Sequence, residues 1–173
     1  MKKENIIIIG MRGVGKSTVG RALAKRLKFR FIDIDDEIER REGLKIKEIV
    51  EREGWESFRE KETEFLKYLL EKETKKAVIS CGGGIVLKEI NRRYLKRLGA
   101  VFYLKANLES LLKRAKFDDK RPPISSNDLR TELETLLKQR ESYYKNLADF
   151  TINTDNKTLE EVVYEMEQIW RTV

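Results

Sequence analysis

Histidine is absent from this sequence of 173 residues, and cysteine and proline are scarce, with one and two residues. Without histidine, a proton acceptor in an active site must be another side chain. The single cysteine, Cys81, cannot form a disulfide within the chain, which fits a reducing compartment. The apolar run at residues 6–9 is too short for a signal peptide or a membrane span. We therefore expect a cytoplasmic protein without a membrane partner.

Long disordered stretches and basic patches are also lacking. Hydrophobic residues make up 40% and charged residues 39% of the chain, which suits one packed domain over residues 1–173. Lysine and arginine exceed aspartate and glutamate by 37 to 30, but the two signs are interleaved, as on solvated helix faces. No basic run with stacking aromatics is present, so we expect no nucleic-acid partner. The positive excess favours small anionic substrates.

Short apolar runs alternate with longer helical patterns along the chain. The last helix is expected to begin with a capping box from Thr158 to Glu161, and to bury a stripe that includes Leu159 and Trp170. Strands are expected at 6–9, 29–33, 77–81, 100–105 and 150–153, and further helices at 17–28, 36–42, 46–53, 55–72, 88–98, 107–114 and 128–147. This alternation predicts an α/β fold in which helices cover both sides of a parallel sheet.

Both prolines fall in the segment 116–127, which has no apolar periodicity. We interpret it as a loop and, from its position, as a mobile lid at about 115–127. Arg114 precedes this lid and Arg121 lies within it. An arginine that closes on a transferring phosphoryl group accelerates transfer by roughly 10³–10⁵. The alternative is that such an arginine is one of many surface cations.

Residues 10–17 match the phosphate-binding pattern G-x-x-x-x-G-K-[ST] and lie between an expected strand and an expected helix. Glycines allow backbone N–H groups to converge on phosphate oxygens, and the helix N-terminus adds partial positive charge. In this pattern Lys16 reaches the β- and γ-phosphates, and the Ser17 hydroxyl is a hard ligand for Mg²⁺. We predict an ATP–Mg²⁺ site here, with a chance glycine turn as the alternative.

Two aspartates, separated by one residue, close the second expected strand. Asp33 and Asp35 are two residues apart, so strand alternation would place both on one side, at the carboxyl end where ligands bind in open α/β folds. The third expected strand lacks a terminal aspartate, so Asp33 is the candidate carboxylate for the metal. It would either bind the ion directly or contact one of the ligands of the ion. Asp35 could then accept the proton of an attacking hydroxyl. The alternative is that one or both cap the following helix.

Charged residues interrupt two apolar helix stripes. Glu62 falls inside the stripe of the helix expected at 55–72, with Arg59 on its margin, and Arg140 lies on the stripe of the helix expected at 128–147. Burying such charges is costly unless something compensates, and a guanidinium binds a carboxylate through two hydrogen bonds. We interpret both arginines as held ready for an anionic ligand. The alternatives are an ordinary i,i+3 pair and an arginine that snorkels to solvent.

Three consecutive glycines, Gly82, Gly83 and Gly84, directly follow the third expected strand. Glycines at the carboxyl end of a strand permit close approach of the backbone to a ligand. A flexible turn would explain them equally, so this motif alone is a weak signal.

Together these motifs resemble the shikimate kinase family, in order and across nearly the whole chain. The matching segments are residues 10–18, Asp33-x-Asp35, Phe58-Arg59-x-x-Glu62, Gly82-Gly83-Gly84, Arg121-Pro122, and Arg140-x-x-x-Tyr144 followed by Ala148-Asp149. The resemblance implies a P-loop NTPase fold of the nucleoside-monophosphate-kinase type, with three α/β/α layers, a five-stranded parallel sheet and a mobile lid. It also implies transfer of the ATP γ-phosphate to the 3-hydroxyl of shikimate, on the pathway to chorismate and the aromatic amino acids.

Carried over by position, the resemblance assigns roles to the matching residues. The side chains implied to be catalytic are Lys16, Asp35 and Arg121. The residues implied to bind ATP are Arg12, Gly13, Val14, Gly15, Lys16, Ser17, Thr18, Arg114, Arg121 and Asn156. Shikimate would be held by Asp35, Arg59, Gly82, Gly83, Gly84 and Arg140, with a shikimate-binding region at about 33–62 and both arginines on its carboxylate. One Mg²⁺ per subunit would be held by Ser17 and Asp33, in an expected monomer.

The sequence departs from the family pattern at one point, and three other functions compete with the interpretation as a shikimate kinase. The family often reads R-x-P-L-Y from the carboxylate arginine, whereas Ser142-Tyr143-Tyr144 lacks the proline. A gluconate kinase would share the P-loop and the lid but would not need two arginines on buried stripes. A nucleoside monophosphate kinase would be expected to carry a D-G-x-P-R segment, which is absent. A non-enzymatic nucleotide-sensing module would not need Asp35 or a lid arginine.

Overall fold

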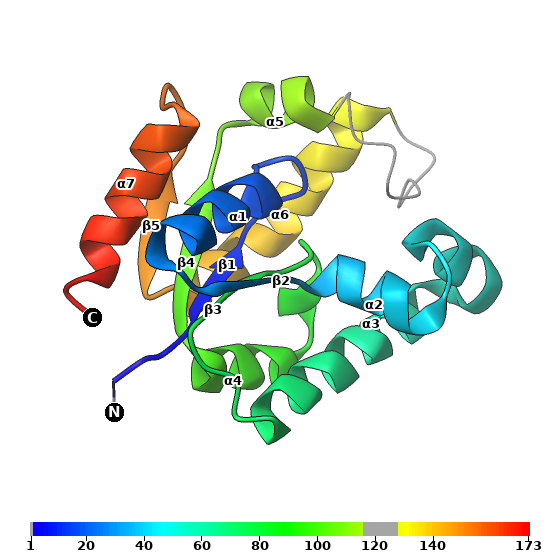
Figure 1. Cartoon of the computed structure of the whole chain (residues 1–173). Helices are drawn as coiled ribbons and strands as arrows, with labels where there is room; N and C mark the ends of the chain where they lie inside the picture. The colour runs from blue at the N-terminus through cyan, green and yellow to red at the C-terminus, as the bar shows by residue number, and fades with distance from the viewer. Residues whose placement is uncertain (1, 116–127) are drawn as a thin grey trace.

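The computed structural model of the protein describes residues 2–115 and 128–173, so the expected lid and Arg121 lie outside the described residues, Ala115 excepted. In the described part, short strands alternate with helices (Figure 1). The strands are β1 (Ile6–Ile9), β2 (Arg30–Asp33), β3 (Ala77–Ser80), β4 (Ala100–Lys105) and β5 (Phe150–Asn153). The helices are α1 (Lys16–Leu27), α2 (Ile34–Glu42), α3 (Ile46–Glu71), the 3₁₀ helix η1 (Ile85–Leu87), α4 (Glu89–Leu98), α5 (Leu108–Ala115), α6 (Leu129–Leu147) and α7 (Leu159–Trp170).

These strands form one parallel sheet in the order β2-β3-β1-β4-β5. The central strand β1 is buried along its whole length, with Ile6 paired to Val78 on one side and to Ala100 on the other. A strand covered on both faces must be apolar at every position, which explains four consecutive isoleucines. α1 and α7 pack together on one face, and α4 and α6 pack on the other (Figure 1). The expected three-layer α/β/α fold is confirmed.

Helices α2 and α3 lie beyond the end of β2 (Figure 1). Gly54 interrupts α3 with φ 83° and ψ 169°, a conformation that side chains with a Cβ rarely adopt. The expectation of two helices at 46–53 and 55–72 therefore agrees with the backbone. The guanidinium of Arg41 on α2 lies over the rings of Phe65 and Tyr68, at 4.7 and 4.1 Å, which fastens α2 to the second half of α3.

The capping box of α7 is present, because Thr158 accepts a hydrogen bond from the backbone N–H of Glu161 and the Glu161 side chain accepts one in return. The prediction that Leu159 belongs to the buried stripe is wrong. It is 42% exposed, and burial along α7 begins only at Val162. None of the helices in the described ranges has the length and apolar character needed to cross a bilayer.

Candidate active site

The motifs meet at the carboxyl ends of three adjacent strands, β2, β3 and β1. Gly10 follows β1, Asp33 ends β2, and Gly82 comes two residues after β3. In a parallel sheet these ends share one edge, which is where open α/β folds bind their ligands. Topology alone therefore gathers segments that are more than 70 residues apart in the sequence.

The loop between β1 and α1 leaves the start of the helix open. Gly13 and Gly15 have left-handed φ angles of 85° and 102°, which lets the backbone turn sharply into α1. No side chain caps α1, and its first turn has no acidic residue, so its N-terminal N–H groups are available to an anion. Lys16 is buried and its Nζ donates to the carbonyls of Gly10 and Met11, both at 2.9 Å. This geometry is a cradle for phosphate.

Asp33, the last residue of β2, contacts both the start of α1 and the start of α2. The Ser17 hydroxyl donates to Asp33 Oδ2 at 2.5 Å, and Asp33 Oδ1 accepts from the backbone N–H of Asp36 at 3.1 Å, which caps α2. The prediction from strand alternation is therefore wrong. The strand ends at Asp33, and Asp35 is half-buried in the first turn of α2 instead. The alternative that Asp33 caps the following helix is thus confirmed, and Asp33 also accepts a hydrogen bond from Ser17, while the metal and proton-acceptor roles of the two aspartates stay predictions.

The oxygen groups beside the loop suit a hard cation. Ser80 Oγ lies 3.4 Å from Ser17 Oγ, next to the carboxylate of Asp33. Within residues 2–115 and 128–173, no group of three or more acidic or cysteine side chains could hold a metal ion. Mg²⁺ in phosphoryl-transfer sites needs only one or two protein oxygens, because nucleotide phosphates and waters complete its octahedron. The Ser17 and Asp33 donor set fits that ion.

Arg59 and Glu62 form a buried ion pair on α3. Glu62 is fully buried and Arg59 is 8% exposed, with Nη1 and Oε1 2.6 Å apart. Burial raises the pKa of Glu62 despite the opposing charge of Arg59. The guanidinium also lies over the rings of Trp55 and Phe58, at 5.2 and 5.3 Å. The predicted position of Glu62 inside the stripe is confirmed.

Arg140 of α6 is buried as well, at 4% exposure, so the snorkelling alternative is wrong. Burial lowers the pKa of this guanidinium most, and the nearby positive charge of Arg59 lowers it further. Within the described ranges, Arg140 Nε, Glu62 Oε2 and Arg12 Nε are buried and lack a hydrogen-bond partner. Unsatisfied buried polar atoms are rare in folded proteins and indicate a ligand or water position.

The glycine segment, residues 82–84, makes room for these arginines. A Cβ on Gly84 would overlap the guanidinium of Arg59, and one on Gly83 would lie 3.3 Å from Nη1 of Arg140. The carbonyl of Gly83 accepts a 2.6 Å hydrogen bond from the hydroxyl of Tyr144. The segment is therefore tightly packed, and the absence of side chains makes room for the two guanidinium groups, while contact of these glycines with a ligand stays a prediction.

The remaining predicted residues lie at the rim of the site or away from it. Arg114 is exposed, and its Nη1 donates to the carbonyl of Val14 at 2.7 Å, next to the phosphate loop. Thr18 is exposed in the first turn of α1. Asn156 is exposed in the turn between β5 and α7, with a left-handed φ of 57°.

Sequence reasoning missed Glu132 of α6. It is 4% exposed, and its Oε1 lies 3.8 Å from Nη2 of Arg12 in the phosphate loop. A signal was present, because Glu132 precedes Arg140 by eight residues and interrupts the same apolar stripe. The contact ties α6 to the loop that follows β1.

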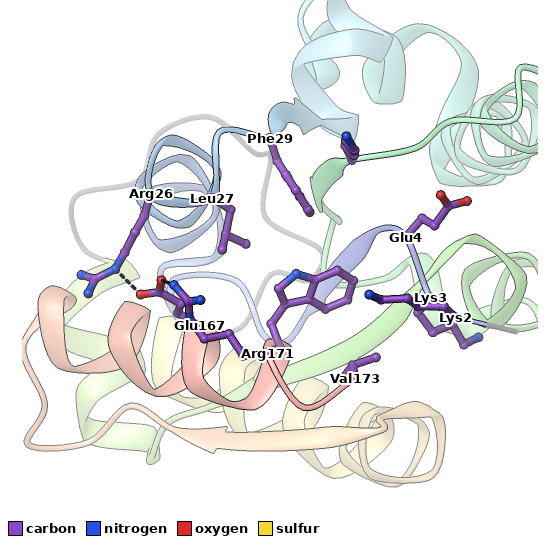
Figure 2. A pocket seen from close by; sticks show the side chains of 11 residues that line it. Lys2, Lys3, Glu4, Arg26, Leu27, Phe29, Glu167, Arg171 and Val173 are labelled. Carbon is purple, nitrogen blue, oxygen red and sulfur yellow. Dashed lines mark hydrogen bonds and ion pairs between the residues drawn. The ribbon is translucent and has the colours of Figure 1, made fainter.

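A pocket at the opposite edge of the sheet takes no part in this arrangement. Figure 2 shows Lys2, Lys3 and Glu4 before β1 facing the C-terminal ends of α1 and α7. Glu167 in its wall accepts hydrogen bonds from Arg26 and Arg171. None of the predicted site residues lines this pocket, which lies at the amino ends of the strands.

The chain is similar to known proteins in both sequence and fold. The family model described as shikimate kinase matches residues 12–170. A shikimate kinase of Legionella pneumophila is 43% identical over 162 residues, which are 94% of this chain and 91% of that protein. The shikimate kinase of Acinetobacter baumannii, solved in complex with shikimate, has a TM-score of 0.92 and 36% identity, covering 98% of this chain and 94% of that one.

A gluconokinase of Sinorhizobium meliloti shares only the fold, with a TM-score of 0.57 and 18% identity over 98% of this chain and 93% of that one. The match to shikimate kinases is thus far stronger, and residues 12–170 include most of the phosphate loop, both arginine helices and the glycine segment. The chain belongs to the shikimate kinase family.

Proposed function

We propose that this protein transfers the γ-phosphoryl group of ATP to the 3-hydroxyl of shikimate, giving shikimate 3-phosphate and ADP on the way to chorismate. Membership of the family supports the reaction. One observation carries the choice of acceptor. Two buried guanidinium groups, those of Arg59 and Arg140, flank Gly83 and Gly84 beside the phosphate loop, with Glu62 as their common carboxylate.

Charge balance argues for a carboxylate ligand at this place. The charge of Arg59 lowers the pKa of Arg140, so the two cations repel each other in the free protein. A substrate carboxylate between them would remove that repulsion and give Arg140 Nε an acceptor. A planar carboxylate matches the fork of donors on a guanidinium, which a hydroxyl or an amine does not.

Roles for the other residues follow from chemistry. Lys16 and the open N-terminus of α1 would bind the phosphates of ATP. Ser17 and Asp33 would hold one Mg²⁺, which supplies positive charge to the phosphates when bound. Asp35 would orient the 3-hydroxyl and accept its proton, since the chain has no histidine for this role. Arg121 as a phosphate contact, the monomeric state and the cytoplasmic location rest on the sequence alone.

Acceptor specificity tests the proposal. ADP release is measured with ATP and Mg²⁺ alone, and then with shikimate, gluconate or a nucleoside monophosphate added. We expect rapid release with shikimate only, and phosphorus NMR should assign the product as the 3-phosphate. Shikimate methyl ester, which keeps the ring and hydroxyls but lacks the charge, should be a poor acceptor. Faster turnover of gluconate or of a nucleotide would contradict the proposal, and equal turnover of the ester would contradict the carboxylate contact.

A further inference from the structure

Two adjacent residues of α4 hold the backbone that follows the glycine segment. Asn91 is fully buried, and its Nδ2 donates to the carbonyl of Ile85 at 3.0 Å. Nη1 of Arg92 donates to the carbonyls of Val86 and Leu87, at 2.7 and 3.1 Å. Three consecutive carbonyl groups of η1, which begins directly after Gly84, are thus bound by α4.

The same asparagine reaches the helix that carries Arg59. The Thr63 hydroxyl lies 2.7 Å from Asn91 Oδ1 and 3.1 Å from the backbone carbonyl of Arg59. A hydroxyl has one proton, and the shorter contact, to Asn91, is the stronger hydrogen bond. The carbonyl of Ile85 can only accept a hydrogen bond, so it must face Nδ2 of Asn91, and Oδ1 then faces the hydroxyl of Thr63. Asn91 therefore joins η1, which directly follows the glycine segment, to the turn of α3 that starts at Arg59.

Arg92 makes the corresponding link to α6. Its guanidinium lies over the ring of Tyr143, 4.7 Å from the centroid. Tyr143 is three residues after Arg140, and the next residue, Tyr144, donates to the carbonyl of Gly83. α4 therefore contacts the two helices that carry Arg59 and Arg140, and also the backbone that directly follows the glycine segment.

We propose that Asn91 and Arg92 are positioning residues that set the distance between the guanidinium groups of Arg59 and Arg140, and so determine affinity for the acid substrate. This inference rests on the proposed function. A bidentate site loses affinity when its donors move by a fraction of an ångström, so the supports of the arginines matter as much as the arginines. Asn91 and Arg92 act through Thr63, Tyr143 and the η1 backbone.

A purely structural role is the competing explanation, because any buried asparagine with good hydrogen bonds stabilises the fold. The chain supplies a matched control in Asn5, which is 2% exposed at the opposite edge of the sheet. Its Nδ2 donates to the carbonyls of Thr74 and Leu98, at 2.6 and 2.8 Å, and its Oδ1 accepts from the N–H of Ala77 at 3.1 Å. Asn5→Leu therefore removes comparable hydrogen bonds far from the arginines.

The test uses Asn91→Leu, Thr63→Val and Thr63→Ser in the full chain, with Asn5→Leu as the control. Shikimate Kd is measured by calorimetry, and kcat, both KM values and Tm are measured alongside. For Asn91→Leu and Thr63→Val we expect shikimate Kd and KM to rise about tenfold, with the KM for ATP within about twofold of wild type. Thr63→Ser retains the hydroxyl and should restore wild-type affinity. Asn5→Leu should lower Tm and leave shikimate affinity unchanged.

The possible results distinguish a failure of the positioning role from a failure of the proposed function. If the wild-type protein neither binds nor phosphorylates shikimate, the proposed function is wrong and the inference falls with it. If the wild type is active, but Thr63→Val and Thr63→Ser share one shikimate Kd, the positioning role is wrong. Asn91→Leu that lowers Tm as Asn5→Leu does, without changing shikimate Kd, would likewise reduce Asn91 to a structural residue. If Asn91→Leu fails to fold, the Thr63 pair still decides.

Discussion

The two halves of the candidate site are built differently. On the nucleotide side, Lys16 and Ser17 already have partners: Lys16 donates to two backbone carbonyls, and Ser17 donates to Asp33, although Arg12 Nε of the loop has no hydrogen-bond partner among the described residues. On the acid side, Arg140 Nε and Glu62 Oε2 are buried without a hydrogen-bond partner in the described part of the chain. One half is assembled from backbone geometry, and the other from buried charged side chains.

This difference separates general from specific binding. A phosphate cradle made of backbone N–H groups accepts any nucleotide tail, and it keeps its shape because its own groups hold it. An unpaired buried donor costs about 1–3 kcal/mol, which the correct ligand can recover by supplying the missing acceptor. We expect the acid side to decide which acceptor is used, and mutations on the two sides to affect different kinetic constants.

The largest expected effect comes from removing the lysine of the nucleotide side. Lys16→Ala should lower kcat by on the order of 10³-fold or more, because a cation on the transferring phosphoryl group is lost. Circular dichroism should show an intact fold. Lys25→Ala, an exposed lysine on the same helix, is the control and should be fully active. Activity of Lys16→Ala within tenfold of wild type would show that the phosphate loop is not the catalytic cradle.

Substitutions of Asp33 and Asp35 test the region between the nucleotide side and the acid side of the site. Asp35→Asn should lower kcat by roughly 10²–10⁴, the range for a positioned general base, with little change in ATP affinity. Asp33→Asn should instead change the Mg²⁺ dependence, while α2 keeps its cap because asparagine caps helices as well as aspartate does. Titration of activity with Mg²⁺ in both variants measures this. A shifted Mg²⁺ requirement in Asp35→Asn alone would mean that the two roles are reversed.

Much of this arrangement was predictable from local patterns. The phosphate loop follows from residue types at fixed spacing, and the sheet follows from short apolar runs between helices. The burial of Glu62 and Arg140 followed from helical periodicity, because charges inside an apolar stripe have to face the core. Each of these signals lies within one segment of the sequence.

The errors and omissions come from contacts between segments. Strand alternation misplaces Asp35, because the sequence alone does not decide whether the extended backbone continues after Asp33 or Asp33 caps α2. The partnership of Arg12 with Glu132, 120 residues apart, and the packing of Gly84 against Arg59 depend on how α6 and α3 dock on the sheet. Helical periodicity predicts which face of a helix is buried, but it does not predict which residues of other elements that face will contact.

On the acid side, Arg59→Ala and Arg140→Ala should each weaken shikimate binding by on the order of 2–5 kcal/mol, because the ligand carboxylate is left under-paired in a closed site. ATP affinity should change little, in contrast to Lys16→Ala. Arg→Lys at either position should also bind poorly, since a point charge cannot reproduce the guanidinium fork. Calorimetry with shikimate and with ADP provides both numbers. Unchanged shikimate affinity in both alanine variants would reject the carboxylate clamp.

The smallest expected effect, and the sharpest contrast, comes from adding one methyl group. Gly84→Ala would overlap the guanidinium of Arg59, whereas Gly99→Ala would overlap the backbone carbonyl of Asn5 at the opposite edge of the sheet. Neither glycine has a left-handed φ, so steric overlap is the only change. A guanidinium at the end of a flexible side chain can move aside, but a backbone carbonyl beside a central strand cannot.

Gly84→Ala should therefore weaken shikimate binding, on the order of tenfold for a displaced binding group, with a modest loss of Tm. Gly99→Ala should show the reverse, a larger loss of Tm with shikimate affinity unchanged. Thermal unfolding and shikimate titration of the two variants test this pair of expectations. If Gly84→Ala binds shikimate as wild type does, Arg59 can leave the glycine segment without loss, and its position there is not what creates the acid site.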